Sequence, residues 1–189
     1  MNRIEQILQE TGALLTGHFL LASGRHGDRY MQCAKVLQYP EHTEYITQAV
    51  ANKFEGETVD IVLAPAVGGI VFGYELARAL GAKAIFTERE NGKMTLRRGF
   101  EIPKHSRVVI AEDVVTTGGS TKEVIAIAKE HEANIIGTCV MVDRSGGNID
   151  FGMKYVAAYS VAIESYMPED CPLCKDGTPV VKPGSRGTR

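Results

Sequence analysis

An apolar strand that ends in two acidic residues and a loop of small residues constrains this chain more than any other feature. The strand reads RVVIA at 107–111, the acidic pair is Glu112 and Asp113, and the run VVTTGGST follows at 114–121. A helical pattern begins at the end of this run. The order of strand, glycine-containing loop and helix is typical of α/β folds, and it exposes backbone N–H groups at the positive end of the helix dipole.

The loop at 114–121 predicts a phosphate site, because outward N–H groups and a helix dipole attract a dianion. Glu112 and Asp113 would repel a phosphate, so they fit a neutral hydroxyl-rich group beside it, such as ribose, or a bound divalent cation. A purely structural role is disfavoured because two adjacent carboxylates are costly to desolvate without a partner. A Walker-type ATP site is disfavoured because the chain lacks the GxxxxGK[ST] spacing.

Alternation of apolar strands with amphipathic helices predicts an α/β fold with a mainly parallel central sheet flanked by helices. The chain of 189 residues fits a single domain. Within it we expect an N-terminal segment at about 1–36, a core at about 40–166 and a Pro- and Gly-rich surface tail at 167–189. Strands are expected at 60–64, 84–87, 107–112 and 135–142, helices at 3–11, 40–54, 70–80 and 120–132, and a hairpin around a polar turn at 23–28.

The composition is that of an ordinary soluble protein, with 44% apolar residues and a net charge of −2. A nucleic-acid partner is disfavoured because there is no large basic excess. No apolar stretch is long enough to span a bilayer, and the polar N-terminus does not resemble a signal peptide. We therefore expect no membrane partner, a cytoplasmic location and reduced cysteines.

A long charged segment at 88–101 predicts a mobile lid over the phosphate site, because loops of this length in compact domains are often functional. Arg89 and Lys93 are cations suited to a pyrophosphate. Lys93 is favoured over Arg97 and Arg98, which could instead hold the base of the lid. A solvated charged turn without a function is the alternative.

Two further segments are expected at the carboxyl ends of the parallel strands, where ligands gather in such sheets. The loop at 64–69 ends in a glycine pair that lets a backbone peptide approach a ligand closely, although such pairs also occur in ordinary turns. Arg144 follows the strand at 135–142 and could grip a planar carboxylate with two parallel hydrogen bonds. An ion pair with Asp143 or Asp150 is the alternative.

The segment at 107–121 resembles the phosphoribosyl pyrophosphate (PRPP) signature of type I phosphoribosyltransferases. Along nearly its whole length, the chain resembles the orotate phosphoribosyltransferase family. The matching segments are 17–19, 23–24, 29–30, 65–69, the charged lid, 107–121 and 142–147. This resemblance implies a type I phosphoribosyltransferase fold with a small N-terminal hood. It also implies a pentosyltransferase that converts orotate and PRPP to orotidine 5′-monophosphate and pyrophosphate in de novo pyrimidine biosynthesis.

The resemblance also implies roles for individual residues. Glu112, Asp113 and Lys93 would be catalytic, Thr117 and Arg144 would bind orotate, and Arg89 with Lys93 would bind the pyrophosphate of PRPP. Mg²⁺ would arrive with PRPP and not at a metal site of the protein itself. A homodimer is implied, in which the lid of one subunit reaches the neighbouring site. The ribose phosphate would lie in a cradle made by Asp113, Val114, Val115, Thr116, Thr117, Gly118, Gly119, Ser120 and Thr121.

The chain departs from the family pattern at several positions. Ala22 replaces a lysine of the hood, Val67 and Gly68 follow the Pro-Ala pair, and the lid contains no histidine, so no general acid is assigned. Two alternative functions remain open. One is transfer to another nucleobase, which would not need Arg144, and the other is a non-catalytic regulator that senses PRPP.

Cys171 and Cys174 have the spacing of a zinc-ligand pair, but the sequence lacks a second such pair. A structural zinc would therefore need two ligands from elsewhere in the chain or from a partner chain, and a redox pair is the alternative. Cys33 and Cys139 lie in predicted strands and are expected in the core.

Overall fold

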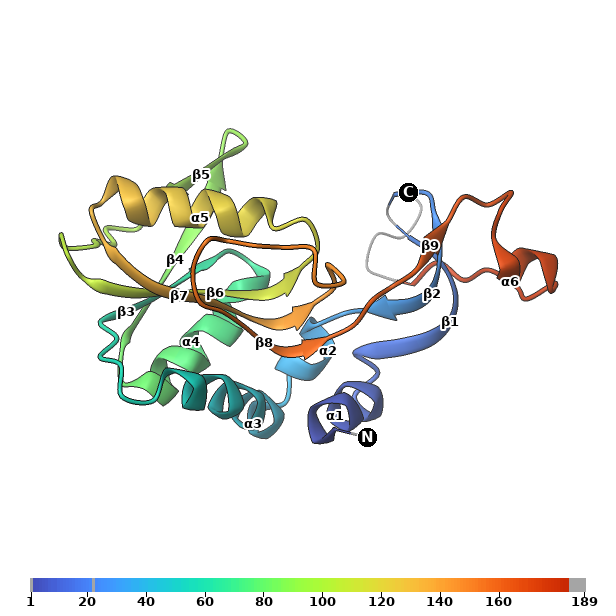
Figure 1. Ribbon diagram of the computed structural model, residues 1–189, viewed down its shortest axis with the longest axis horizontal. Helices are drawn as coiled ribbons and strands as arrows, with labels where there is room; N and C mark the ends of the chain where they lie inside the picture. Colours follow the sequence, from blue (N-terminus) through green and yellow to red (C-terminus); the bar gives the residue numbers. More distant parts are fainter. Residues whose placement is uncertain (1, 22, 184–189) are drawn as a thin grey trace. The chain divides into compact units, whose positions relative to one another are not determined.

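The computed structural model describes residues 2–21 and 23–183, and the chain divides into two units (Figure 1). The first unit combines Met1–Val36 with Ala162–Arg189, and the second comprises Leu37–Val161. The residues predicted as a separate surface tail therefore belong to the same unit as the N-terminal segment. Ala22, where the chain departs from the family pattern, lies outside the described residues.

The second unit contains a six-stranded sheet in the order β5-β4-β3-β6-β7-β8. Adjacent strands pair in parallel, except that β5 runs antiparallel to β4. The expected mainly parallel α/β architecture is confirmed. The strands are β3 (Ile61–Pro65), β4 (Lys83–Glu90), β5 (Lys93–Leu96), β6 (Arg107–Val115), β7 (Asn134–Asp143) and β8 (Tyr155–Ser160).

Helices cover both faces of this sheet. The helices α3 (Pro40–Ala51) and α4 (Gly68–Leu80) lie on one face, and α5 (Gly119–Glu130) lies on the other (Figure 1). Every residue of β3 is buried, as expected for a central strand that is covered on both sides. A short 3₁₀ helix, Asn52–Phe54, extends α3, and α2 (Ala34–Leu37) spans the boundary between the two units in the sequence.

The helix α4 packs unusually close to the sheet at Gly73. A Cβ atom added to Gly73 would lie 2.9 Å from the Cβ of Ala64 and 3.8 Å from that of Ala111. Ala64 belongs to β3 and Ala111 to β6, so this contact sets the height of α4 above two central strands. Because real Cβ atoms do not approach each other so closely, any side chain at position 73 must push the helix away from the sheet.

Two elements differ from the sequence expectations. The segment predicted as an irregular lid is a hairpin of β4 and β5, with the turn at Asn91 and Gly92, which have φ angles of +52° and +82°. An Asn-Gly pair with two positive φ angles is a strong hairpin signal, and the charged flanks obscured it. The strand β8 was not predicted.

The described residues of the first unit include the helix α1, three strands and the short helix α6. Ile4, Ile7 and Leu8 are buried on α1 (Arg3–Glu10), as their helical spacing predicted. A hairpin of β1 (Leu14–Leu20) and β2 (His26–Met31) is present, with its strands shifted toward the N-terminus relative to the prediction. The strand β9 (Ser165–Tyr166) adds to β2, and α6 (Pro172–Lys175) follows. None of the described helices combines the length and the apolar character needed to cross a bilayer.

Replacing Gly73 by alanine should lower the free energy of unfolding by about 1–3 kcal/mol, because the added methyl group overpacks the contact with Ala64. Chemical denaturation of the variant measures this loss. Gly119→Ala is the matched control, since its Cβ would meet only the Thr117 hydroxyl, at 3.8 Å. A Gly73→Ala variant as stable as the control would contradict the packing argument.

Candidate functional site

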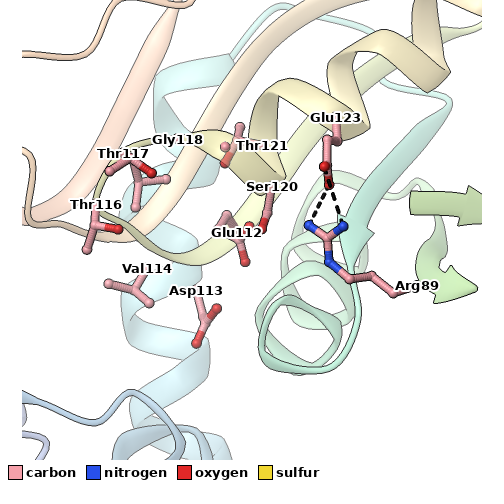
Figure 2. A pocket seen from close by; sticks show the side chains of 12 residues that line it. Arg89, Glu112, Asp113, Val114, Thr116, Thr117, Gly118, Ser120, Thr121 and Glu123 are labelled. Atoms are coloured by element: carbon pink, nitrogen blue, oxygen red, sulfur yellow. Dashed lines mark hydrogen bonds and ion pairs between the residues drawn. The ribbon is translucent and has the colours of Figure 1, made fainter. Parts of the chain in front are cut away.

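The loop between β6 and α5 lines a cavity of about 450 Å³ at the carboxyl end of the sheet. All ten residues from Glu112 to Thr121 contribute to it, so the acidic pair and the predicted cradle face one space. In the view of Figure 2, Thr116 and Thr117 lie on one side of the acidic pair, and an ion pair lies on the other. The full lining is Arg89, Glu112, Asp113, Val114, Val115, Thr116, Thr117, Gly118, Gly119, Ser120, Thr121 and Glu123.

The helix α5 begins at this cavity without a side-chain cap. Gly118, the residue before the helix, has a left-handed φ of +73° and makes no side-chain cap hydrogen bond. A Cβ at Gly118 would also lie 3.1 Å from the Phe151 ring, so glycine is required here for two reasons. The first N–H groups of a helix have no partner within the helix. With no side-chain cap, those of α5 remain available to an anion in the cavity.

The two acidic residues at the end of β6 hold their protons more tightly than exposed carboxyl groups. Glu112 is only 7% exposed, and burial, followed by the charge of Asp113, raises its pKa from 4.5 to about 9. Burial also raises the pKa of Asp113. Desolvation disfavours the charged form of each group, and a second negative charge adds to that cost. Both effects favour the protonated forms of the pair relative to exposed carboxyl groups.

Two glycines bring the loop after β3 against these carboxyl groups. A Cβ on Gly68 would lie 2.6 Å from Oδ1 of Asp113, and one on Gly69 would lie 3.4 Å from Oε1 of Glu112. Because Gly68 is the first residue of α4, the Asp113 carboxyl group lies at the positive end of that helix. The N–H of Ala66 donates to the carbonyl of Thr87 at 2.7 Å, which ties the loop to β4. The Ala66–Val67 peptide bond is cis.

One of the two cations predicted to bind pyrophosphate lies at the cavity, and the other does not. Arg89 lines the cavity and pairs with Glu123 of α5, with Nη2 at 2.6 Å from Oε2 (Figure 2). Sequence reasoning missed Glu123, because it lies 34 residues from Arg89 and no local pattern joins them. Lys93 is exposed at the start of β5, and the cavity lining does not include it.

The remaining arginines of the predicted lid hold its hairpin together. Arg98 donates from Nε and Nη2 to the two carboxylate oxygens of Glu88, at 2.7 and 2.8 Å, and its guanidinium lies 5.8 Å from the centre of the Phe86 ring. Arg97 pairs with Glu90 at 3.3 Å. These contacts tie the residues after β5 back to β4, so the segment expected to be irregular has a defined conformation.

Arg144 lies directly after β7, beside the end of β6. Its backbone N–H donates to the carbonyl of Val115 at 2.8 Å, which joins the two strand ends. The preceding residue, Asp143, is buried and accepts a hydrogen bond from the N–H of Ser145 at 2.7 Å. The side chain of Arg144 is partly buried, and Arg144 is not among the residues that line the cavity.

The family model of the phosphoribosyl transferase domain matches residues 34–156. The orotate phosphoribosyltransferase of Pelotomaculum thermopropionicum is 51% identical over 185 residues, which cover 98% of this chain and 97% of that protein. The orotate phosphoribosyltransferase of Thermotoga maritima is 47% identical over 186 residues, which cover 98% of this chain and 100% of that protein.

Solved structures show the same fold. The crystal structure of orotate phosphoribosyltransferase from Aeropyrum pernix matches with a TM-score of 0.69 and 24% identity, over 84% of this chain and 93% of that chain. The adenine phosphoribosyltransferase of Thermoanaerobacter pseudethanolicus matches with a TM-score of 0.61 and 17% identity, over 70% of this chain and 88% of that chain. The fold by itself is therefore shared by enzymes that act on different bases.

The raised pKa of Glu112 predicts a stability that falls as the pH rises. Between the ordinary pKa of 4.5 and the folded value of about 9, the folded protein holds a proton that the unfolded chain releases. The free energy of unfolding should therefore decrease across this pH range, and Glu112→Gln should remove part of the decrease. Denaturant titrations between about pH 5 and pH 9 measure both slopes. The exposed Glu101→Gln is the control, and identical slopes for Glu112→Gln and the parent protein would contradict the prediction.

Proposed function

The chain belongs to the orotate phosphoribosyltransferases of the phosphoribosyltransferase family, and we propose on this basis how its residues perform the reaction. The enzyme converts orotate and PRPP to orotidine 5′-monophosphate and pyrophosphate. One observation carries the assignment of the site: the buried carboxyl pair and the uncapped N-terminus of α5 face the same cavity. An acidic pair beside an anion site suits a ribose phosphate and suits few other ligands.

The loop from Thr116 to Thr121 binds the 5-phosphate of PRPP. Its exposed members, Thr116, Thr117, Gly119 and Ser120, are accessible from the cavity, and the N–H groups of the first turn of α5 are not capped. Among the described residues, the buried Oγ1 atom of Thr121 has no hydrogen-bond partner, which leaves it available for a phosphate oxygen. The small residues permit the close approach that a bound phosphate requires.

Glu112 and Asp113 bind the ribose hydroxyl groups and stabilise the transition state. Displacement at the anomeric carbon gives the ribose ring oxocarbenium character, and nearby negative charge favours the developing cation. Negative charge on the pair serves this task, whereas burial raises both pKa values and favours the protonated forms. A cation bound beside the pair would lower both pKa values, and the proton would then pass to water.

The residues of the cavity fit the Mg²⁺ that PRPP carries. Carboxyl oxygens are the donors that Mg²⁺ prefers, and two buried carboxyl groups with raised pKa values fit a site that a divalent cation would complete. When bound with PRPP, Mg²⁺ neutralises charge on the pyrophosphate leaving group. Glu112 and Asp113 are the described residues that would lie next to it.

Orotate binds through Thr117 and Arg144, with the guanidinium of Arg144 on the orotate carboxylate. Thr117 belongs to the cavity lining, and the end of the strand β7 brings Arg144 next to Val115. A guanidinium can bind a planar carboxylate through two parallel hydrogen bonds, which distinguishes orotate from bases without that group.

Lys93 contacts the pyrophosphate of a neighbouring subunit in a homodimer. The exposed position of Lys93, outside the cavity of its own chain, supports this assignment. The ion pairs of Arg97 and Arg98 support it further, because they stiffen the hairpin that would carry Lys93 to the partner. Arg89 contributes to the pyrophosphate site of its own chain, and this requires that it leave Glu123. We also propose that the reaction takes place in the cytoplasm.

Arg144→Ala should lower kcat/KM for orotate roughly 10- to 100-fold, because a charge-assisted carboxylate contact is lost, while the KM for PRPP changes little. Loss of orotate absorbance in the presence of PRPP and Mg²⁺ measures the rate, and parallel assays test uracil, hypoxanthine and adenine. Arg78→Ala is the matched control, because Arg78 pairs with Glu44 and Glu75 away from the cavity. Unchanged orotate turnover in Arg144→Ala would contradict the assignment. Turnover with another base alone would contradict the proposed substrate.

A mixture of two inactive variants tests the shared site. Lys93→Ala and Asp113→Asn should each have little activity as pure proteins. If Lys93 acts in the neighbouring site, a mixed dimer contains one intact site and one with both defects. Random re-association should then restore about a quarter of the parent activity, because half of the dimers are mixed and half of their sites are intact. No recovery after subunit exchange, verified by mass spectrometry of the mixed dimers, would contradict the proposal.

A further inference from the structure

Four potential metal ligands from distant parts of the chain meet in the first unit. They are His18 of β1, His26 of β2, Cys171 just before α6 and Cys174 within α6. Their ligand atoms all lie within 4.8 Å of one another, and three of the four residues are buried. Figure 1 locates the elements that carry them, β1, β2 and α6. None of these residues belongs to the site proposed for phosphoribosyl transfer.

The spacing of the four atoms fits a tetrahedral zinc ion. With zinc bonds of about 2.0–2.3 Å, ligand atoms lie about 3.3–3.8 Å apart at the corners of a tetrahedron. Nε2 of His18 lies 3.5 Å from Sγ of Cys171 and 3.7 Å from Sγ of Cys174. Nδ1 of His26 lies 3.2 Å from Sγ of Cys174 and 2.9 Å from Nε2 of His18. The remaining pairs lie within 4.8 Å of one another, so side-chain shifts of about 1 Å would complete the tetrahedron.

A backbone carbonyl orients the first histidine for metal binding. Nδ1 of His18 lies 2.7 Å from the carbonyl oxygen of Thr178. Because a carbonyl oxygen only accepts hydrogen bonds, Nδ1 carries the proton, and Nε2 of the neutral ring presents its lone pair to the other three ligands. Metal-binding histidines commonly donate their second N–H to such a group, which fixes the tautomer and the ring orientation.

The β-hairpin brings the two histidines into contact. In the pairing of β1 with β2, Leu20 lies opposite His26, and the register shifts between Thr16 and Phe19, so His18 lies in a strand irregularity. The rings of His18 and His26 meet edge to face, with their centroids 4.8 Å apart. The hairpin thus brings together two residues that are separated by seven others.

The polypeptide around the two cysteines has little else to hold it. Among the described residues from 162 to 183, only Cys171 is buried, and no residue of α6 is. Backbone hydrogen bonds of Val181 with His18 and Leu20 attach the end of this segment to β1. A segment with so few buried apolar groups gains stability from a metal or a disulfide that ties it to the rest of its unit.

We propose that His18, His26, Cys171 and Cys174 bind one structural Zn²⁺ that anchors the C-terminal segment to the β1–β2 hairpin. Two thiolates balance the charge of the ion, so the complete site is neutral and tolerates burial. Two imidazole nitrogens and two thiolates in a tetrahedral arrangement select zinc over Mg²⁺ or Ca²⁺. All four positions are filled by protein, as in structural sites and in contrast to catalytic ones. A Cys171–Cys174 disulfide is the alternative use of these thiols. Such a disulfide would leave His18 and His26 without a role.

Metal analysis of the full-length, untagged protein tests the proposal. Protein purified without chelator and dialysed against metal-free buffer should contain about one zinc per chain. Cys174→Ser should reduce this to less than about one tenth. This variant is the most informative, because Cys174 is the exposed member of the group and its replacement disturbs packing least. Cys33→Ser is the matched control, a cysteine of the same unit outside the group, and it should keep its zinc.

Cobalt substitution reports the geometry independently of turnover. Co²⁺ added to the metal-free protein should give the visible absorption of a tetrahedral ion and a near-ultraviolet thiolate charge-transfer band, and Cys174→Ser should weaken the latter. The proposal is overturned if the purified protein contains no zinc and binds neither Zn²⁺ nor Co²⁺ at equimolar concentration. Equal zinc content in Cys174→Ser and the parent, or quantitative recovery of a Cys171–Cys174 disulfide by alkylation and mass spectrometry, would also overturn it. None of these readouts depends on the proposed phosphoribosyl transfer.

Discussion

The burial of two adjacent carboxyl groups at the end of β6 is the constraint on which the rest of the site depends. Asp113 lies against the start of α4, where a Cβ at Gly68 would come within 2.6 Å of its carboxyl oxygen, so only glycine leaves room there. The strand β3 lies beside β6 in the sheet, and this neighbourhood brings the loop after β3 to the carboxyl pair. Desolvation disfavours the charged form of both groups, and the mechanism proposed above therefore assigns a cation to the space beside them.

The two units are stabilised by different means. The second unit has a central sheet covered on both faces, and its apolar contacts include one that only Gly73 permits. The first unit holds few buried apolar groups in its C-terminal segment, where Cys171 alone is buried among the described residues from 162 to 183. Hydrophobic burial stabilises the sheet of the second unit, whereas the proposed zinc would hold the C-terminal segment of the first unit in place.

The strands that sequence reasoning predicted best are those with continuous apolar runs, such as β3, β6 and β7, because burial on both faces leaves a strong local pattern. The hairpin of β4 and β5 was not predicted, because charged residues dominate the segment. Its Asn91-Gly92 pair is nevertheless a strong sequence signal for a hairpin turn. Arg89 and Glu123 show a different limit of prediction from the sequence. Each is an ordinary surface residue by pattern, and only the fold brings them together.

Local sequence and tertiary structure therefore each determine a part of the candidate site. By itself, the sequence determined the carboxyl pair and the loop proposed to bind phosphate, because residues 112–121 are contiguous and their chemistry follows from local order: strand, acid pair, small loop, helix. Only the tertiary structure decided which side chains meet them, through the approach of Gly68 to Asp113 and the pairing of Arg89 with Glu123. The same holds for the group of His18, His26, Cys171 and Cys174, whose histidines precede its cysteines by more than a hundred residues. Contacts of that kind depend on strand pairing and chain reversal over long distances, and no local pattern in the sequence records them.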